Sequence, residues 1–153
     1  MSAMTGTIIL CDQVYQAQGG KFIIAGTYTT IEVRCKDLHR AEHQVNGLNL
    51  YLRLRPERTG PLPCRIVIRD ELQPPWVEPV LATNWEARVD ERSIRLLEMA
   101  MMSPSFLVRA QVPEEGIIAG RAQLKYSIGF LVDGELIATT PLDIVFVHEA
   151  NRT

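Results

Sequence analysis

The clearest group of possible metal ligands in the sequence is Cys35, His39 and His43. Their spacing of four and four residues would place the three side chains on one face of a helix, where they could ligate a transition metal. The surrounding segment is rich in charged residues, which is typical of a polar surface turn, and no fourth ligand lies beside it. A surface turn is therefore the favoured interpretation, and a metal site is the alternative.

Four arginines on two neighbouring segments, Leu48–Arg55 and Cys64–Arg69, form the second group. If the two segments pair as a hairpin, the guanidinium groups share one outer face and could bind a phosphate, a carboxylate or an acidic protein surface. The alternative is a solvated face, which the net charge of −2 favours. The candidate anion ligands are Arg53, Arg55, Arg65 and Arg69.

Sequence patterns typical of catalysis are absent. The chain contains no Gly-x-Ser-x-Gly, no phosphate-binding glycine loop, no His-Glu-x-x-His and no Cys-x-x-Cys. Its three histidines leave few candidates for a general base. We therefore expect no catalytic residues and no cofactor, and a hydrolase site assembled from distant residues ranks last.

The two tryptophans differ in their surroundings. Trp76 lies among Pro74, Pro75 and Pro79, and its place stays open; an aromatic side chain in a loop could anchor a ligand or a partner. Trp85 lies on an alternating apolar segment and is expected in the core.

The elements that must position these residues have a period of two. In Leu48–Arg55, four leucines alternate with polar or tyrosine side chains, and Asn84–Asp90 and Ala122–Val132 repeat the pattern. Such alternation predicts half-buried strands of antiparallel sheets.

Turn residues separate these strands. Asp133-Gly134 predicts a tight hairpin that pairs Phe130 with Ile137. Gly19-Gly20 predicts another hairpin, and Gly26 lies where the apolar parity of its second strand changes, which one bulge would explain.

Two segments stay open: Cys35–Gln44 could form a short helix, and Ser93–Met102 could be a helix or a strand. The remaining pattern predicts an all-β fold, a single antiparallel β-sandwich, immunoglobulin-like or related, over residues 1–153. The length of 153 residues suits one domain, and the 46% hydrophobic content can fill its core.

Composition also limits the partners. The mildly acidic balance disfavours a general nucleic-acid binder, and no apolar run is long enough to span a membrane. Three cysteines are too few for a disulfide framework, and no secretory signal is evident, so a cytoplasmic location is expected.

The segments Ile8–Val14, Gly19–Phe22 and Ile24–Tyr28 resemble the start of a family of uncharacterised small bacterial proteins. That family carries a Cys-Asp-x-Val strand, a glycine-containing turn and an Ile-Gly-x-Phe strand. Leu48–Leu54 and Phe130–Glu135 are similar to its later strands. The resemblance implies a β-sandwich and assigns no activity.

A non-enzymatic binding or assembly module is the function that these observations favour. Its partner would be another protein or a second copy of the chain. Self-association is suggested by Val145 and Val147, which make the second face of the last strand apolar. A small-ligand or metal-binding module is the alternative.

Overall fold

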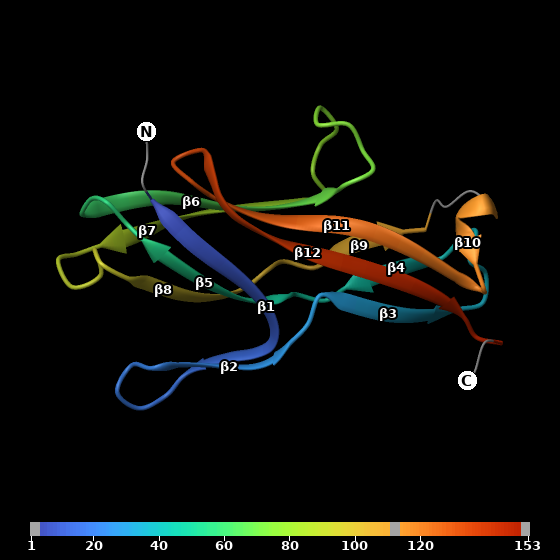
Figure 1. Cartoon of the computed structure of the whole chain (residues 1–153), viewed down its shortest axis with the longest axis horizontal. Helices are drawn as coiled ribbons and strands as arrows, with labels where there is room; N and C mark the ends of the chain where they lie inside the picture. The colour runs from blue at the N-terminus through green and yellow to red at the C-terminus, as the bar shows by residue number, and fades with distance from the viewer. Residues whose placement is uncertain (1–3, 111–113, 151–153) are drawn as a thin grey trace.

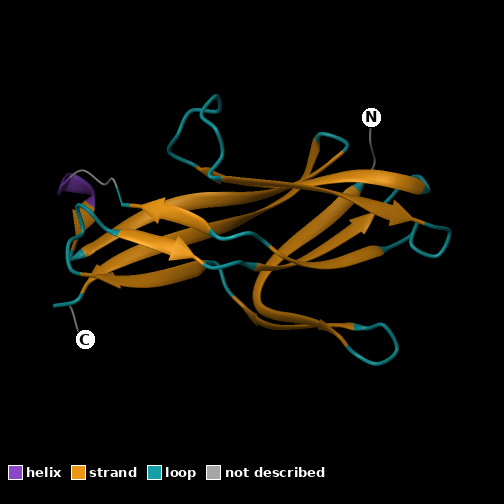
Figure 2. Cartoon of the chain, turned by 180° about the vertical axis from the view of Figure 1, so that it is seen from behind, coloured by secondary structure: helices purple, strands orange, loops and turns teal. Residues whose placement is uncertain are grey.

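The computed structural model describes residues 4–110 and 114–150, whose regular structure consists of strands and one 3-10 turn, η1 (Glu114–Gly116), with no α-helix among them. The strands are β1 (Thr5–Gln16), β2 (Phe22–Thr27), β3 (Thr30–Cys35), β4 (Glu42–Val45), β5 (Asn49–Arg55), β6 (Gly60–Asp70), β7 (Leu81–Val89), β8 (Leu97–Met102), β9 (Phe106–Arg109), β10 (Ile117–Ile118), β11 (Arg121–Val132) and β12 (Glu135–His148). Most of them run along the long axis of the molecule (Figures 1 and 2).

The strands form two main sheets and one short pair. The larger sheet has the order β3-β12-β11-β6-β7, with β10 beside β11, and the smaller sheet has the order β2-β1-β5-β8. The short pair is β4-β9. All pairings are antiparallel except that of β3 with β12. The predicted all-β sandwich is therefore confirmed.

The strand order is that of an immunoglobulin-like sandwich. In immunoglobulin domains, strands A, B and E share a sheet edged by D, and C, F and G form the facing sheet. Here β1, β5 and β8 take the places of A, B and E, and β6, β11 and β12 take those of C, F and G. Strand β7 lies beside β6, as C′ does in variable domains. Among the described strands, none takes the place of D beside β8.

The alternating segments supply the core as predicted. Leu50, Leu52 and Leu54 of β5 are fully buried, and so are Ile128 and Phe130 of β11. These side chains belong to one hydrophobic cluster that both sheets and the β4-β9 pair share. Burial of apolar surface between the layers therefore holds the sandwich together.

Strands β4 and β9 continue β5 and β8. The antiparallel register is the same in both pairs: Val45 lies opposite Phe106, and Leu50, five residues later, lies opposite Met101, five residues earlier. The interruption lies at Ser103, which is 4% exposed. Its hydroxyl accepts a hydrogen bond of 2.9 Å from the Leu48 amide and donates one of 3.1 Å to the carbonyl of Pro104. The serine thus satisfies backbone groups that the ladder leaves at this break.

The chain crosses from one sheet to the other after Gly26. Strand β2 ends at Thr27 in the smaller sheet, and β3 begins at Thr30 in the larger one. The change of apolar parity comes from this crossing, so the predicted single bulge is wrong. Gly26 has a φ of +67°, and a Cβ there would meet the carboxylate of Asp12. This left-handed backbone conformation favours glycine.

The predicted Asp133-Gly134 turn is confirmed, since both residues have positive φ, +52° and +78°. A register shift next to the turn pairs Phe130 with Ala138 rather than with Ile137. The segment Ser93–Met102, which the sequence left open, is a turn followed by β8.

The apolar second face of the last strand is covered within the chain. Val147 is 4% exposed and Val145 is half-buried. Val145 and Val147 therefore offer no wide apolar surface to another subunit.

Replacement of Ser103 by alanine should destabilise the protein by about 1–3 kcal/mol, because the buried Leu48 amide loses its acceptor. Urea unfolding followed by circular dichroism measures the change. Ser105→Ala, at an exposed position two residues away, is the control and should stay within about 0.5 kcal/mol of the parent. Equal midpoints for the two variants would contradict this role of Ser103.

Candidate functional site

The structure does not bring Cys35, His39 and His43 together. Cys35 ends β3, and His43 lies on β4. His39 lies in the turn between these strands, and its backbone amide donates to Oδ1 of Asp37. The helix considered for Cys35–Gln44 is wrong, because this segment turns and then pairs with β9. Within residues 4–110 and 114–150, no group of three or more histidine, cysteine or acidic side chains could hold a metal ion.

The four arginines do not share a face either. Arg53 and Arg55 lie on β5, which pairs with β1 and β8, whereas Arg65 and Arg69 lie on β6, which pairs with β7 and β11. The predicted hairpin of these two segments is wrong because the chain passes from the smaller to the larger sheet between them. The arginines form two separate pairs.

An apolar cleft opens between the edge strands of the two sheets. Strand β7 ends the larger sheet and β8 ends the smaller one, and the cleft between them has a volume of about 480 Å³. The side chains that give it its apolar character are Trp85, Ala87, Leu97, Met99 and Met101, with Thr83 beside them.

These side chains point into the sandwich but remain incompletely covered. Met99 and Met101 are register partners of Leu52 and Leu50, which are fully buried, yet both methionines are only partly buried. Trp85 stacks on Phe130, with ring centroids 6.1 Å apart and planes 4° from parallel, and is half-buried. The hydrophobic core therefore reaches solvent at this edge.

Each strand along the cleft has one backbone edge without a described partner strand. Among the strands that the structure describes, β8 pairs only with β5, and β7 only with β6. Natural edge strands are usually protected by charges, proline or bulges. Strand β8, with the sequence Leu-Glu-Met-Ala-Met-Met, has one charge and none of the other devices. This edge can therefore pair with another strand.

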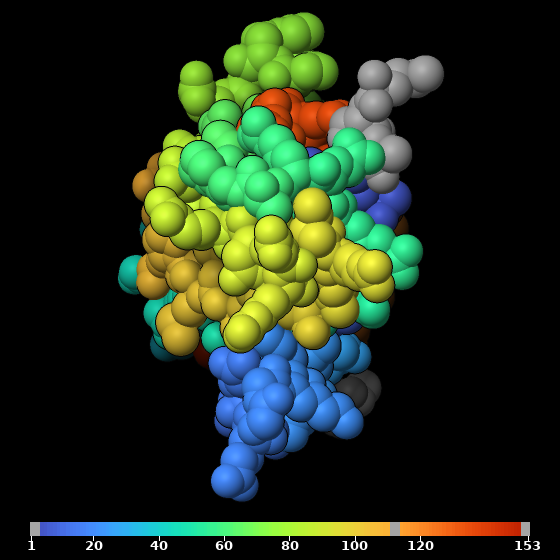
Figure 3. Space-filling model, turned by 90° about the vertical axis from the view of Figure 1, so that its left-hand side faces the viewer, coloured from blue at the N-terminus to red at the C-terminus, as the bar shows by residue number. Residues whose placement is uncertain are grey.

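A second surface carries the loop between β6 and β7, residues 71–80, which projects from the body in Figures 1 and 3. Trp76 at its tip is 83% exposed and Leu72 is 75% exposed. The loop is nevertheless fixed: Oδ1 of Asp70 accepts from the Leu72 amide at 2.9 Å, and Nη1 of Arg69 donates to the Val77 carbonyl at 3.1 Å. An exposed tryptophan on such a loop has no packing role in this chain.

A trough lies on the outer face of the larger sheet. It has a volume of about 220 Å³ and a floor of Val67 and Gly129, with Leu131 and Leu136 on one side. Arg65 and Arg69 line its β6 side, and Arg69 also holds the loop. Two of the four predicted anion ligands thus border an apolar surface. We call the trough and the loop 71–80 together the loop-side face.

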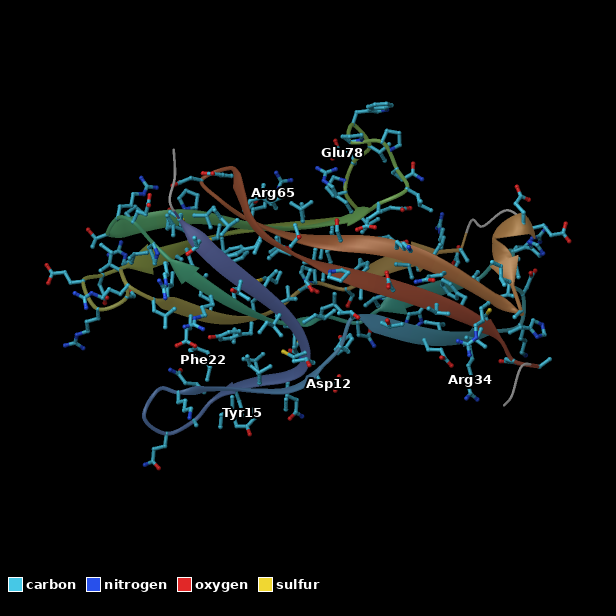
Figure 4. All side chains as sticks on the ribbon, viewed as in Figure 1. Asp12, Tyr15, Phe22, Arg34, Arg65 and Glu78 are labelled. Atoms are coloured by element: carbon cyan, nitrogen blue, oxygen red, sulfur yellow. The ribbon has the colours of Figure 1, made fainter. Side chains whose placement is uncertain are left out.

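The hairpin of β1 and β2, which forms one edge of the smaller sheet, projects on the side of the molecule opposite the loop 71–80 (Figures 1 and 3). In Figure 4, Phe22 points from this hairpin toward the sheet and Tyr15 points away. Phe22 packs on Tyr51, with ring centroids 5.8 Å apart, and the Tyr51 hydroxyl donates to Glu98. Burial, together with Glu98, raises the pKa of Tyr51 to about 12.

Sequence comparisons add no relative. No protein-family model matches the chain, and no curated protein matches it either, so the resemblance to the bacterial family stays a prediction. In the part of the chain that the structure describes, no helix has the length and apolar character needed to cross a bilayer.

The sequence partly indicated these surfaces. The sequence left the place of Trp76 open, and the structure puts it in a loop; the expected core position of Trp85 is half correct. The sequence analysis did not predict the cleft, because the cleft exists only where no described strand follows β8 at the edge of the smaller sheet. The strand–helix ambiguity of Ser93–Met102 concealed β8.

Stability should fall at high pH, in part through Tyr51. The fold favours its neutral phenol, so its contribution is complete below about pH 10, the ordinary tyrosine value, and is lost as the pH rises toward about 12. The difference in denaturation midpoint between about pH 8 and about pH 11 should be smaller in Tyr51→Phe than in the parent. Tyr15→Phe, at an exposed position, should leave that difference unchanged.

Proposed function

We propose that the chain is a non-enzymatic binding module that accepts an extended segment of a partner protein along β8, in the cleft between β7 and β8. The observation that carries the proposal is that no described strand pairs with the outer edge of β8, directly beside core side chains that are partly exposed. The partner segment would take the place that strand D occupies in immunoglobulin domains.

The backbone of β8 supports a peptide as the occupant. Its free N–H and C=O groups alternate along an edge, and an added strand satisfies them in a ladder. A small apolar molecule could fill the cleft but would leave these backbone groups to solvent. The edge therefore favours a polypeptide over a small ligand.

The cleft indicates which side chains the segment carries. Because alternate residues of a strand point to opposite faces, every second side chain would enter the cleft. Met99 and Met101 are flexible and polarisable, so they can adapt to apolar side chains of different shapes. The proposed partner is thus an extended segment with apolar residues at alternate positions.

A synthetic peptide of about ten residues, alternating valine and threonine, tests the proposal. The protein is used as Trp76→Phe, which leaves Trp85 as its only tryptophan. Binding should change the Trp85 fluorescence in a saturable manner, because the indole lines the cleft. The same peptide N-methylated on the amides of one edge should not bind, since it cannot form the ladder.

Matched variants locate the binding. Thr83→Arg places a long cationic side chain in the cleft and should weaken binding at least about tenfold. Asn84→Arg, next to it but exposed on the other face of β7, should leave binding unchanged. Circular dichroism verifies that both variants fold.

Two results would overturn the proposal. One is the absence of any fluorescence response to the peptide. The other is equal binding of the N-methylated peptide, which would favour a small-ligand cleft without strand addition.

A further inference from the structure

We infer that the loop-side face binds a second copy of this chain, so that Trp76 of each copy enters the trough of the other about a two-fold axis. This surface lies away from the β7–β8 cleft, and the inference is independent of the proposed function. It rests on three features of the face: an exposed anchor, a recess that suits it and charges of both signs.

The anchor is Trp76. Exposed tryptophans on well-fixed loops lose little conformational freedom on binding and are frequent energetic centres of interfaces. Val77 and Val80 extend the apolar surface of the loop, with exposures of 38% and 39%. The loop is held by the Arg69–Val77 hydrogen bond and by a 3.0 Å bond from the Val77 amide to the Pro74 carbonyl.

The recess is the trough beside the loop. Its apolar side chains, among them Leu136 at 57% exposure, offer an indole ring a surface to pack against. Gly129 lets the Leu136 side chain pack closely over β11, since a Cβ there would lie 3.1 Å from Cδ1 of Leu136. No described residue of the loop 71–80 lines the trough, so its exposed rim at Leu136 is open to a side chain of another molecule.

The charges favour a second copy as that occupant. Arg65 and Arg69 border the trough, whereas Glu71 and Glu78 lie on the loop, and none of the four takes part in an ion pair among the described residues. Figure 4 shows Arg65 and Glu78 on the same side of the molecule, Arg65 on the sheet and Glu78 on the loop. In an isologous contact the loop of each copy meets the trough of the other, so acidic residues face arginines twice.

Sedimentation equilibrium of the full chain over a concentration series tests the inference. The parent should form dimers, and Trp76→Ala should weaken dimerisation at least about tenfold. Ile118→Ala, which removes an equally apolar side chain that is 74% exposed on β10, is the control and should dimerise as the parent does.

A charge exchange tests the geometry itself. Arg65→Glu makes the trough acidic against an acidic loop, and Glu78→Arg makes the loop basic against a basic trough, so each variant alone should dimerise at least about tenfold more weakly. An equimolar mixture of the two should form a heterodimer, because each trough then faces a loop of opposite charge. Arg69 is left unchanged because it positions the loop.

Three outcomes would overturn the inference: a parent chain that stays monomeric at about 1 mM, dimerisation that Trp76→Ala leaves intact, or a mixture that associates no better than its components. A parent monomer would direct attention to a different protein as the occupant of this face.

Discussion

The two layers of this sandwich must cover each other, and they do not have the same strands at their edges. The larger sheet extends through β7, whereas the smaller one stops at β8. Full burial of the central leucine rows is reached because every inward position of β5 and β11 has a facing layer. At the β7–β8 edge that condition fails, since no described strand lies beside β8. The apolar cleft between β7 and β8 and the strand edge beside it both follow from this mismatch.

The mismatch leaves part of the free energy of apolar burial unrealised in the isolated chain. An apolar side chain gains roughly 25 cal/mol for each Å² removed from water, and Trp85, Met99 and Met101 realise only part of that gain in the isolated chain. The remaining core still holds the two layers together, and Ser103 satisfies backbone groups where β8 gives way to β9. The exposed edge is thus compatible with a stable chain and leaves binding energy for a partner. The loop-side face differs from the cleft in that its exposed groups, such as Trp76, lie on a loop and are not part of the core.

Local patterns predicted the strands and tight turns well. Alternation in Leu48–Arg55 and Ala122–Val132, and the Asp133-Gly134 turn, depend on neighbours in sequence and are confirmed. Sheet membership was not predictable in the same way, because it depends on contacts between distant strands. For this reason the arginines were assigned to one face although β5 and β6 lie in different layers. In the sequence, the spacing of Cys35, His39 and His43 fits a helix as well as it fits a turn. In the structure, the pairing of β4 with β9 prevents that helix.

The parallel pairing of β3 with β12 has a mechanical consequence. The two ends of the chain lie toward opposite ends of the long axis (Figure 1), so tension applied between them acts along β12. Strand β12 is held laterally by six register pairs with β3, from Asp143 with Thr30 to His148 with Cys35. A pull along the strand loads these pairs together in shear, whereas a hairpin pulled at its open end would separate one pair at a time. The molecule is therefore built to resist stretching along its length better than peeling across it.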